Sequence, residues 1–429
     1  MHNLVFRRVV TIGCAAVLAA SGAACSSDRG GGGGEAGGKI QLSINDWGNF
    51  GYTELIKEYE ASHPNIDIVE RVGDYNQTHQ GLVQKLAAGS GAPDIAAIDE
   101  GYIVQFREQA QNFVNLLDTP AIAARKDQYL PWKWEQSLSA DGKTQIGLGT
   151  DVGGLAMCYR PSLFKKAGLP TDREEVGALW TTWQDYINVG KTFASKNTGA
   201  KWVDSAVSIF NPVISQTSEA FYTKDNQLIV GSNPQVKDAW DIATGIIENK
   251  ESANLQTSTA PWNAGLQKAA FATMACPSWM RGQVSQNAPK TKGDWDVAKV
   301  PGTGGNWGGS FLTVPKQGKH TAEAIELANW LTAPEQQIKT FKAAGTLPSI
   351  PSLYEDAAVK DFKDEFFNSA PVGQIFTSAA AGLKPLYLGP KNGAVRVAIE
   401  NALTAVQQGN LAPDAGWTRA VKDAEKANK

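Results

Sequence analysis

The chain alternates between two hydrophobic periods over residues 40–98. Apolar residues at every second position predict strands over 40–44, 66–72 and 95–98, and the two segments between them carry helical spacing. Strands joined by helices need crossover connections, which are right-handed and place the strands parallel in one sheet. The N-terminal part of the chain is therefore predicted to be an α/β lobe.

The rest of the chain continues in mixed strand and helix patterns. Its 429 residues favour two or three domains on a prior of about 150 residues per domain. A loop is expected over 302–310, which is rich in glycine. Further strands are predicted over 154–159, 271–275 and 311–314, and further helices over 179–193, 236–248, 322–331, 335–343 and 394–408.

Aromatic and acidic residues follow the predicted strands of the N-terminal lobe. Trp47 and Phe50 come after the first strand, Asp74 after the second, and Asp99 with Glu100 after the third. Ligands of open α/β sheets bind beyond the carboxyl ends of the strands. Carboxylates accept hydrogen bonds from hydroxyl groups, and aromatic planes cover apolar C–H faces, so this edge suits a sugar. The alternative for any single acid is that it only caps the following helix.

Tryptophan is more frequent than tyrosine, with 13 Trp against 10 Tyr. This surplus indicates a need for large flat apolar faces, and carbohydrate is the first ligand that it suggests. Trp residues inside helical patterns are expected in the core: Trp180, Trp183, Trp240 and Trp330. Trp residues at strand ends or in loops are candidates for ligand contact: Trp47, Trp262, Trp279 and Trp307.

The first residues read as a targeting segment. Arg7 and Arg8 precede an apolar run over 9–20, small residues and Cys25, as in a signal peptide over 1–24. The small residues before Cys25 resemble a bacterial lipobox, which predicts a lipidated thiol; an ordinary secretory signal is the alternative. Residues 25–38 are glycine-rich and read as a flexible tether.

Two cysteines remain after Cys14 leaves with the signal and Cys25 is lipidated. Cys158 and Cys276 are expected to form a disulfide, because thiols in an oxidising compartment tend to pair. Two separately buried free cysteines are the alternative.

Several function classes have no support in the sequence. Lys+Arg of 40 against Asp+Glu of 43 gives a net charge of −3 without a basic block, so no nucleic-acid partner is expected. His63, His79 and His320 lack metal-ligand spacing, and we expect no metal or other cofactor. No nucleophile elbow and no singled-out carboxylate pair is present, so we predict that the protein is not an enzyme.

Five sequence stretches together resemble one family. The chain resembles the extracellular solute-binding proteins of ABC sugar importers, the family that includes maltose-binding protein, over essentially all of its mature length. The stretches are GAPDI at 91–95, MCYRPSLFKKAGLP at 157–170, ACPSW at 275–279, WGGS at 307–310 and WLTAPEQQ at 330–337.

The resemblance implies a two-lobed α/β fold with a hinge and a ligand cleft between the lobes. The N-terminal lobe would comprise 39–150 plus 310–352, and the C-terminal lobe 151–309 plus 353–429. Trp279 would stack on a sugar ring, Asp99 and Glu100 would bind hydroxyls, and Asp151 would lie at the crossing. The candidate ligand-binding residues are Trp47, Phe50, Asp74, Asp99, Glu100, Asp151, Trp262, Asn263, Trp279, Arg281 and Trp307.

The same resemblance implies a substrate-binding lipoprotein that delivers an oligosaccharide to the permease subunits of an importer. It would be a monomer, anchored by lipid to the outer face of the cell membrane. Residues 168–175 and 306–311 look most like members that bind cellobiose and cello-oligosaccharides; xylo-oligosaccharide and chitobiose are rivals. The alternative of another class is a secreted glycoside hydrolase. A binding module for peptides or metal chelates is disfavoured by the Trp surplus and the few histidines.

Overall fold

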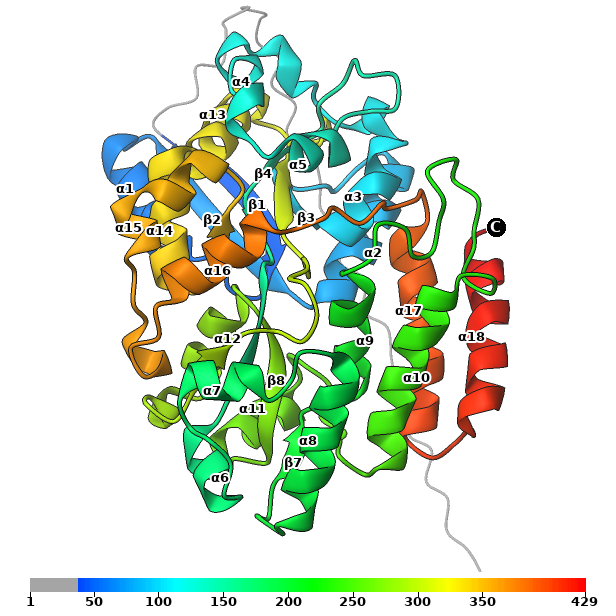
Figure 1. Ribbon diagram of the computed structural model, residues 1–429. Coiled ribbons are helices and arrows are strands. Elements are labelled where there is room, and N and C mark those ends of the chain that lie inside the picture. The colour runs from blue at the N-terminus through cyan, green and yellow to red at the C-terminus, as the bar shows by residue number, and fades with distance from the viewer. Residues whose placement is uncertain (1–37) are drawn as a thin grey trace, which may run out of the picture. The chain divides into compact units, whose positions relative to one another are not determined.

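Two β-sheets organise the computed structural model, which describes residues 38–429 (Figure 1). We call the five-stranded sheet with its helices the first lobe and the four-stranded sheet with its helices the second lobe. The first sheet has the strand order β2 (Ile66–Gly73), β1 (Ile40–Trp47), β3 (Ile95–Asp99), β10 (Ser310–Thr313), β4 (Gly147–Gly149). The second has the order β7 (Lys201–Val203), β8 (Phe271–Pro277), β6 (Leu155–Tyr159), β9 (Asp296–Ala298).

The first three strands of the first sheet are parallel, as the sequence predicts. Ile40 pairs with Ile66 at the start of β1 and β2, and Ile44 pairs with Ile95 of β3. Leu42 and Ile44 are fully buried on one face of β1, where alternation places them. The sheet as a whole is mixed, because β10 returns from the second lobe and pairs antiparallel with both β3 and β4.

The second sheet is also mixed. Strands β6 and β8 pair antiparallel, β9 pairs antiparallel with β6, and β7 pairs parallel with β8. All residues of β6 and β8 are buried, so these strands are covered on both faces. Continuous apolar runs are typical of such strands.

Helices surround both sheets. The final helices α17 and α18 lie side by side, and α17 also contacts α3 of the first lobe and α9 and α10 of the second (Figure 1). Before the first crossing lie α1 (Thr53–Ser62), α2 (Tyr75–Ala88), α3 (Glu100–Arg107), α4 (Pro120–Ala123) and α5 (Pro131–Gln136). Between the crossings lie α6 (Pro161–Lys166), α7 (Arg173–Ala178), α8 (Trp183–Ser195), α9 (Val207–Ile214), α10 (Pro234–Glu248), α11 (Ala260–Gln267) and α12 (Met280–Asn287). After them come α13 (Thr321–Leu331), α14 (Pro334–Ala344), α15 (Ala357–Lys360), α16 (Val372–Ala381), α17 (Asn392–Gln407) and α18 (Pro413–Ala427).

The helix predicted over 179–193 begins later than the hydrophobic pattern indicates. The Thr182 side chain accepts a hydrogen bond from the Asp185 backbone N–H, and the Asp185 carboxylate accepts one from the Thr182 backbone N–H. This capping box starts α8 at Trp183 and separates it from α7.

The chain passes between the sheets beside two short strands. Residues of β5 (Asp151–Val152) lie between β4 and β6 and pair with β11 (Leu347–Pro348). The segment from β9 back to β10 runs against the same crossing, since the Trp307 backbone N–H donates to the Gly153 carbonyl at 2.9 Å. The two domain ranges set out above stay a prediction.

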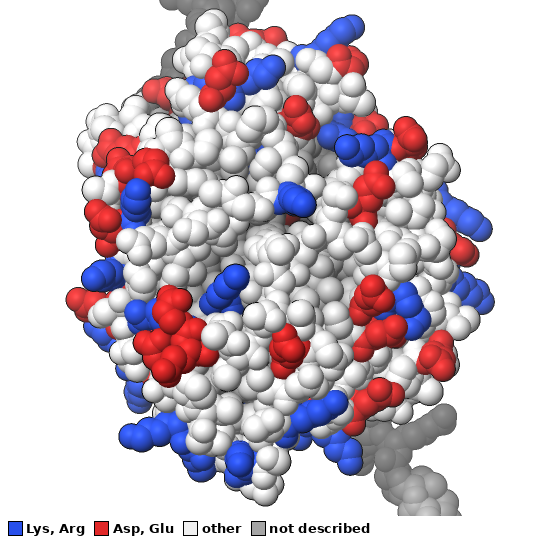
Figure 2. Space-filling model, in the orientation of Figure 1, with Lys and Arg blue, Asp and Glu red and all other residues white. Residues whose placement is uncertain are grey.

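The large aromatic residues expected in the core are mostly there. Trp180 and Trp240 are 1% exposed and Trp183 is 6% exposed, all within the second lobe, whereas Trp330 is half-buried beside the first. On the surface, acidic and basic side chains are interspersed over the face that Figure 2 shows, in keeping with the small net charge.

Candidate ligand-binding cleft

A cavity of about 500 Å³ lies between loops of the first lobe and helices of the second. We call it the interlobe cleft, and its size is within the range of small-molecule sites. The first lobe contributes Trp47, Gly48, Asn49, Phe50, Gly73, Asp74, Tyr75, Asn76 and Asp99. The crossings contribute Asp151, Trp279, Trp307, Gly308, Gly309, Ser310 and Thr346. The second lobe and α17 contribute Ser205, Val207, Ser208, Asn211, Gln256, Thr257, Ser258, Thr259, Asn263, Gln283, Gln286, Asn287, Arg396, Val397 and Glu400.

Aromatic rings of the first lobe gather at the loop after β1. Trp47 meets Phe50 edge to face at 5.3 Å between ring centroids, and it meets Tyr75 of α2 in the same way at 5.5 Å. Gly48 separates Trp47 from the rest of the turn with a φ of +69°, in the left-handed region that favours glycine. The turn after β1 thereby brings both predicted aromatics, Trp47 and Phe50, to the cleft.

Two predicted acids of the first lobe cap helices and line the cleft as well. The Asp74 side chain accepts from the Gln77 backbone N–H at the start of α2, and the Asp99 side chain accepts from the Gly101 backbone N–H at the start of α3. Asp99 also accepts a hydrogen bond of 2.9 Å from the Tyr75 hydroxyl. Each of these two acids therefore caps a helix and lines the cleft at the same time, because a helix that follows a strand begins at this edge of the sheet.

His79 lies behind these residues and fixes them to each other. Its Nδ1 lies 2.7 Å from the Tyr75 carbonyl, and its Nε2 lies 2.9 Å from the Asp99 backbone N–H. A carbonyl can only accept and a backbone N–H can only donate, so His79 is the neutral Nδ1–H tautomer. Burial lowers its pKa to about 4, which keeps it neutral at physiological pH. Its ring also stacks on Tyr102 at 4.3 Å.

The crossings carry the second group of aromatic rings. The Trp279 indole N–H donates to the Trp307 carbonyl at 2.8 Å, and the two rings meet edge to face at 5.8 Å. A side chain at Gly153 would collide with the Trp307 carbonyl, so only glycine fits this close approach. Asp151 is 4% exposed and accepts from the Ser310 backbone N–H at 2.9 Å; burial raises its pKa.

The second-lobe wall is made of hydroxyl and amide side chains. The Ser205 backbone N–H and the hydroxyls of Ser208 and Thr257 donate to the buried carboxylate of Asp204, which does not itself line the cleft. Sequence reasoning missed this group, because no hydrophobic or aromatic signal marks a serine that faces a ligand. Asn263, a predicted ligand residue, lies on the same wall.

Helix α17, the last but one of the chain, also reaches the cleft, which sequence reasoning did not foresee. Arg396 donates to the Tyr75 hydroxyl at 2.6 Å, and Glu400 accepts from the Asn211 side chain at 2.6 Å. The helix itself was predicted, but only the tertiary structure places its face against residues of both lobes.

Three predicted ligand residues lie behind the cleft instead of lining it. Glu100 accepts from the Asn306 amide at 2.6 Å, and burial raises its pKa to about 8. Trp262 is fully buried and its indole N–H donates to Asp204 at 2.9 Å. Arg281 is 2% exposed and pairs with Asp364. Each lies close in the sequence to a residue that lines the cleft, but the hydrogen bond or ion pair that it forms lies inside the protein.

The structure joins Cys158 and Cys276 in a disulfide with a Cα–Cα distance of 5.3 Å. It connects the neighbouring strands β6 and β8 of the second sheet, two residues before the loop that carries Trp279. The predicted lipidation site Cys25 and the predicted signal peptide over 1–24 lie outside the described residues. Within residues 38–429 no His, Cys, Asp and Glu group could hold a metal ion, and no helix is long and apolar enough to cross a membrane.

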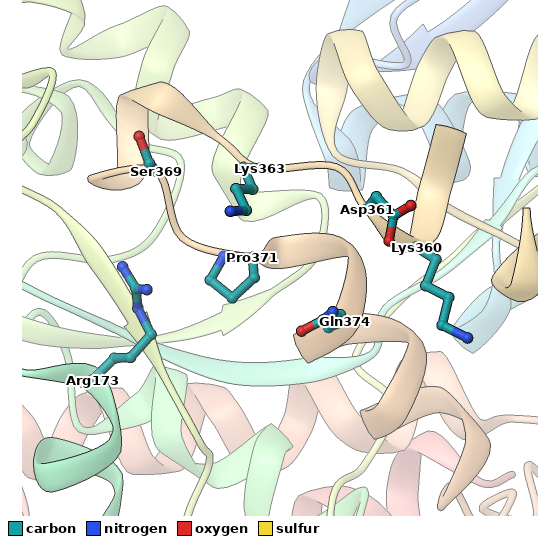
Figure 3. A pocket seen from close by; sticks show the side chains of 7 residues that line it. All are labelled: Arg173, Lys360, Asp361, Lys363, Ser369, Pro371 and Gln374. Atoms are coloured by element: carbon teal, nitrogen blue, oxygen red, sulfur yellow. The ribbon is translucent and has the colours of Figure 1, made fainter. Parts of the chain in front are cut away.

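A second cavity, of about 520 Å³, opens beside α16 (Figure 3). Its lining is Arg173, Lys360, Asp361, Lys363, Ser369, Pro371 and Gln374. Arg173 comes from the start of α7 and forms two hydrogen bonds with Asp296, at 3.0 and 3.1 Å. This cavity has no aromatic ring among its lining residues, so the combination of aromatic planes and free polar groups belongs to the interlobe cleft.

Two α/β lobes with a cleft between them, lined by rings and polar groups, define a protein that binds a small ligand between its lobes. Residues 54–367 match the family model described as Bacterial extracellular solute-binding protein. The chain belongs to this family, whose members are binding proteins and not enzymes.

Individual relatives agree with this assignment. The chain is 26% identical over 364 residues to an arabinooligosaccharide-binding protein of Bacillus subtilis strain 168, covering 79% of each chain. It is 41% identical to a solved extracellular solute-binding protein of family 1, with a TM-score of 0.77 and coverage of 91% of this chain and 100% of that one. A binding protein associated with an ABC transporter of B. animalis subsp. lactis Bl-04, solved with beta-1,6-galactobiose, is 20% identical with a TM-score of 0.81; coverage is 91% and 98%. The expected two-lobed α/β fold is confirmed.

Proposed function

We propose that this protein captures an oligosaccharide in the interlobe cleft and delivers it to the permease of an ABC importer. The observation that carries the proposal is the lining of the cleft: Trp47, Phe50, Tyr75, Trp279 and Trp307 supply planes beside carboxylates and amides. Sugar rings have apolar faces that suit such planes and hydroxyls that suit such acceptors. The relatives named for arabinooligosaccharide and galactobiose binding support the same class of ligand.

The identity of the sugar is a finer proposal. The local sequence over 168–175 and 306–311 favours cellobiose and cello-oligosaccharides, with xylo-oligosaccharide and chitobiose as rivals. The curated relatives favour arabinooligosaccharides instead, at 26% and 23% identity. We rank arabinooligosaccharide and cello-oligosaccharide together as the leading candidates, because the curated relatives favour the first and the local sequence favours the second.

Calorimetric titration with arabino-, cello-, xylo-, galacto- and chito-oligosaccharides tests the proposal. We expect saturable binding of at least one series with micromolar affinity or better, quenched or enhanced Trp fluorescence, and unchanged sugar on chromatography afterwards. Absence of binding across the panel would overturn the proposal. Release of shorter products would instead favour the glycoside hydrolase alternative.

We also propose that the mature protein is a lipid-anchored monomer on the outer face of the cell membrane. The support is the sequence before residue 38, where Cys25 follows small residues and precedes a glycine-rich stretch. Metabolic labelling with palmitate should mark the wild-type protein in its native host and should not mark a Cys25→Ser variant. Equal labelling of both would exclude Cys25 as the modified residue.

A further inference from the structure

Resting on the proposed function, we infer that Arg396 joins the two lobes across the cleft and raises the affinity for the sugar by favouring their closed arrangement. The contact is a chain of two hydrogen bonds, from the Arg396 guanidinium to the Tyr75 hydroxyl and from that hydroxyl to the Asp99 carboxylate. We call this chain the interlobe latch. All of its atoms belong to the protein, so it can form before a sugar enters the cleft.

The second lobe carries the Arg396 end of the latch. Val395 and Ile399, its neighbours on α17, are fully buried in the same hydrophobic core as residues of α8 and α10. One turn further along α17, the Glu400 carboxylate accepts a hydrogen bond of 2.6 Å from the Asn211 side chain of α9. Helix α17 is therefore fixed to the second lobe, and any movement between the lobes moves Arg396 relative to the first lobe.

The first lobe carries the Tyr75 and Asp99 end of the latch. The Tyr75 hydroxyl has a single hydrogen, which it donates to the Asp99 carboxylate at 2.9 Å. Its lone pairs remain free to accept from Arg396, at 2.6 Å. The two bonds therefore support each other, with a positive group at one end of the chain and a negative group at the other. Hydrogen bonds with an ionised partner are stronger than those between neutral groups.

His79 holds the first-lobe end of the latch in place. It is 1% exposed, and its two ring nitrogens join the Tyr75 carbonyl, at 2.7 Å, to the Asp99 backbone N–H, at 2.9 Å. The Asp99 carboxylate also accepts from the Gly101 backbone N–H at 2.8 Å. Tyr75 and Asp99 are thus held relative to each other by bonds within one lobe. The bond between Arg396 and Tyr75 is the link of the chain that a movement of the lobes would break.

The latch lies beside a packing contact between the lobes. At Gly393, in the first turn of α17, an added Cβ would come within 3.0 Å of the Tyr102 ring and within 3.1 Å of the Gly101 carbonyl, both of α3. Gly393 does not line the cleft, whereas Arg396, about one turn further along, does. The lobes therefore meet at two points along α17. A hydrogen bond at the second point resists rotation of the lobes about the first.

The effect on affinity follows from the equilibrium between open and closed lobes. A sugar that contacts both walls binds the closed arrangement, so its apparent affinity falls with the closed fraction of the free protein. Loss of a hydrogen bond to a charged group should lower the ratio of closed to open protein by about fivefold or more. The apparent affinity for the sugar should fall by up to the same factor.

Small-angle X-ray scattering from the sugar-free protein tests this inference. Tyr75→Phe removes the hydroxyl and keeps the ring that meets Trp47, and Arg396→Met removes the guanidinium and keeps an unbranched side chain. We expect each variant to have a larger radius of gyration than the wild type. The double variant should show no further increase, because either substitution alone breaks the chain. Equal radii for the sugar-free wild type and all three variants would overturn the inference.

Two matched controls remove hydrogen bonds from the exposed surface. Tyr387 donates to Asn226 and Arg419 donates to Asp423, and neither Tyr387 nor Arg419 lines the cleft. Tyr387→Phe and Arg419→Met should leave the radius of gyration unchanged. An increase in these controls as large as in the latch variants would overturn the inference, because opening would then not depend on the latch.

Calorimetry separates the latch from a direct bond between Arg396 and the sugar. The Arg396 Nε has no hydrogen-bond partner among the described residues, so a direct bond is the alternative. We expect Tyr75→Phe and Arg396→Met each to weaken sugar binding. If Arg396→Met bound weakly while Tyr75→Phe bound as tightly as the wild type, the inference would be wrong. Failure of every sugar in the panel would overturn the proposed function, whereas the scattering from sugar-free protein would still test the latch.

Discussion

The two walls of the interlobe cleft are built from different chemistry. The first-lobe wall brings the rings of Trp47, Phe50 and Tyr75 next to carboxylates in the loops after its strands. The second-lobe wall, formed by the loop before α9 and by faces of α9, α11, α12 and α17, contributes hydroxyls, amides and one ion pair, and no ring among its lining residues. Trp279 and Trp307 lie between the walls at the crossings.

This difference between the walls indicates how each contributes to the affinity for the sugar and to the orientation in which it is held. Aromatic planes supply apolar burial plus about 1 kcal/mol each from ring contacts. A neutral hydrogen bond exchanged with water supplies about 0.5–1.5 kcal/mol and depends strongly on direction. We infer that the rings provide most of the affinity and that the polar wall fixes which sugar is held and in which direction.

The largest expected effect is on stability, from a residue just behind the cleft. Arg281 pairs with Asp364 inside the protein and is surrounded by Phe341, Phe362 and Phe376. Arg281→Met should lower the free energy of unfolding by about 3–5 kcal/mol, because it leaves the Asp364 carboxylate without its partner. Urea denaturation measures the loss, and sugar affinity should stay within a factor of two below the unfolding transition.

The double variant Arg281→Met with Asp364→Asn is the control. It removes both charges while keeping a carbonyl that can cap the turn at Phe366, and it should recover much of the lost stability. If Arg281→Met instead weakened sugar binding tenfold at full stability, Arg281 would belong to the binding wall after all.

Trp279, two residues earlier, should show the opposite behaviour. Trp279→Ala should weaken sugar binding at least tenfold, because it removes a ring at the crossing and its hydrogen bond to the Trp307 carbonyl. Calorimetry of the variant measures the loss. Trp417→Ala, on α18 and remote from the cleft lining, is the matched control and should bind as tightly as the wild type. Unchanged affinity of Trp279→Ala would remove the crossing rings from the site.

The contrast between the walls also explains what could be predicted from sequence. Period-2 and helical patterns located β1, β2 and β3 with their helices, and the rule that ligands bind beyond strand ends then placed Trp47, Phe50, Asp74 and Asp99 at the cleft. This works because each residue is attached directly to a strand whose position is fixed by the sheet. Several helices were not predicted, among them α9, which carries an internal proline, and α18, which begins at Pro413 and has many small residues.

The second wall could not be found in the same way. Ser208, Asn211 and Glu400 lie on helix faces whose direction depends on how α9 and α17 pack, and no local pattern encodes that packing. Trp262 is the opposite case. It was expected to contact the ligand because its sequence context resembles a loop, but it lies on α11 and its indole N–H donates to Asp204 inside the protein. The composition of a segment does not reveal which of its polar groups are already satisfied inside the protein.

Asp204 offers a test of the polar wall that combines substitution with pH. Asp204→Asn replaces an acceptor oxygen with an N–H donor that faces other donors, so it should weaken sugar binding about three- to tenfold at pH 7. In the wild type, affinity should fall as pH drops below about 6, because burial raises the pKa of Asp204 to about 6 and protonation removes acceptor capacity. The variant should lack this part of the pH dependence in calorimetry.

Stability should respond to Asp204 with the opposite sign. The folded pKa of about 6 exceeds the unfolded value of about 3.9, so between these pH values the folded state binds a proton that the unfolded state does not. The free energy of unfolding therefore falls as pH rises from about 4 to about 6, by about 3 kcal/mol from this group. Ser208→Ala, which keeps the carboxylate, should retain this slope, and Asp204→Asn should lose it. Parallel pH profiles for wild type and Asp204→Asn would contradict the assignment.

The smallest effect is expected at the outer edge of the second wall. Gln286 lies on α12, lines the cleft and is exposed, so its amide exchanges a water hydrogen bond for a sugar hydrogen bond with little net gain. Gln286→Ala should weaken binding about two- to threefold and should leave the unfolding transition unchanged. The measurement is the same calorimetric titration used for Trp279→Ala, on the same sugar. A loss as large as that of Trp279→Ala would mean that affinity resides in the amide face of α12 as much as in the rings, and the proposed division between the two walls would fail.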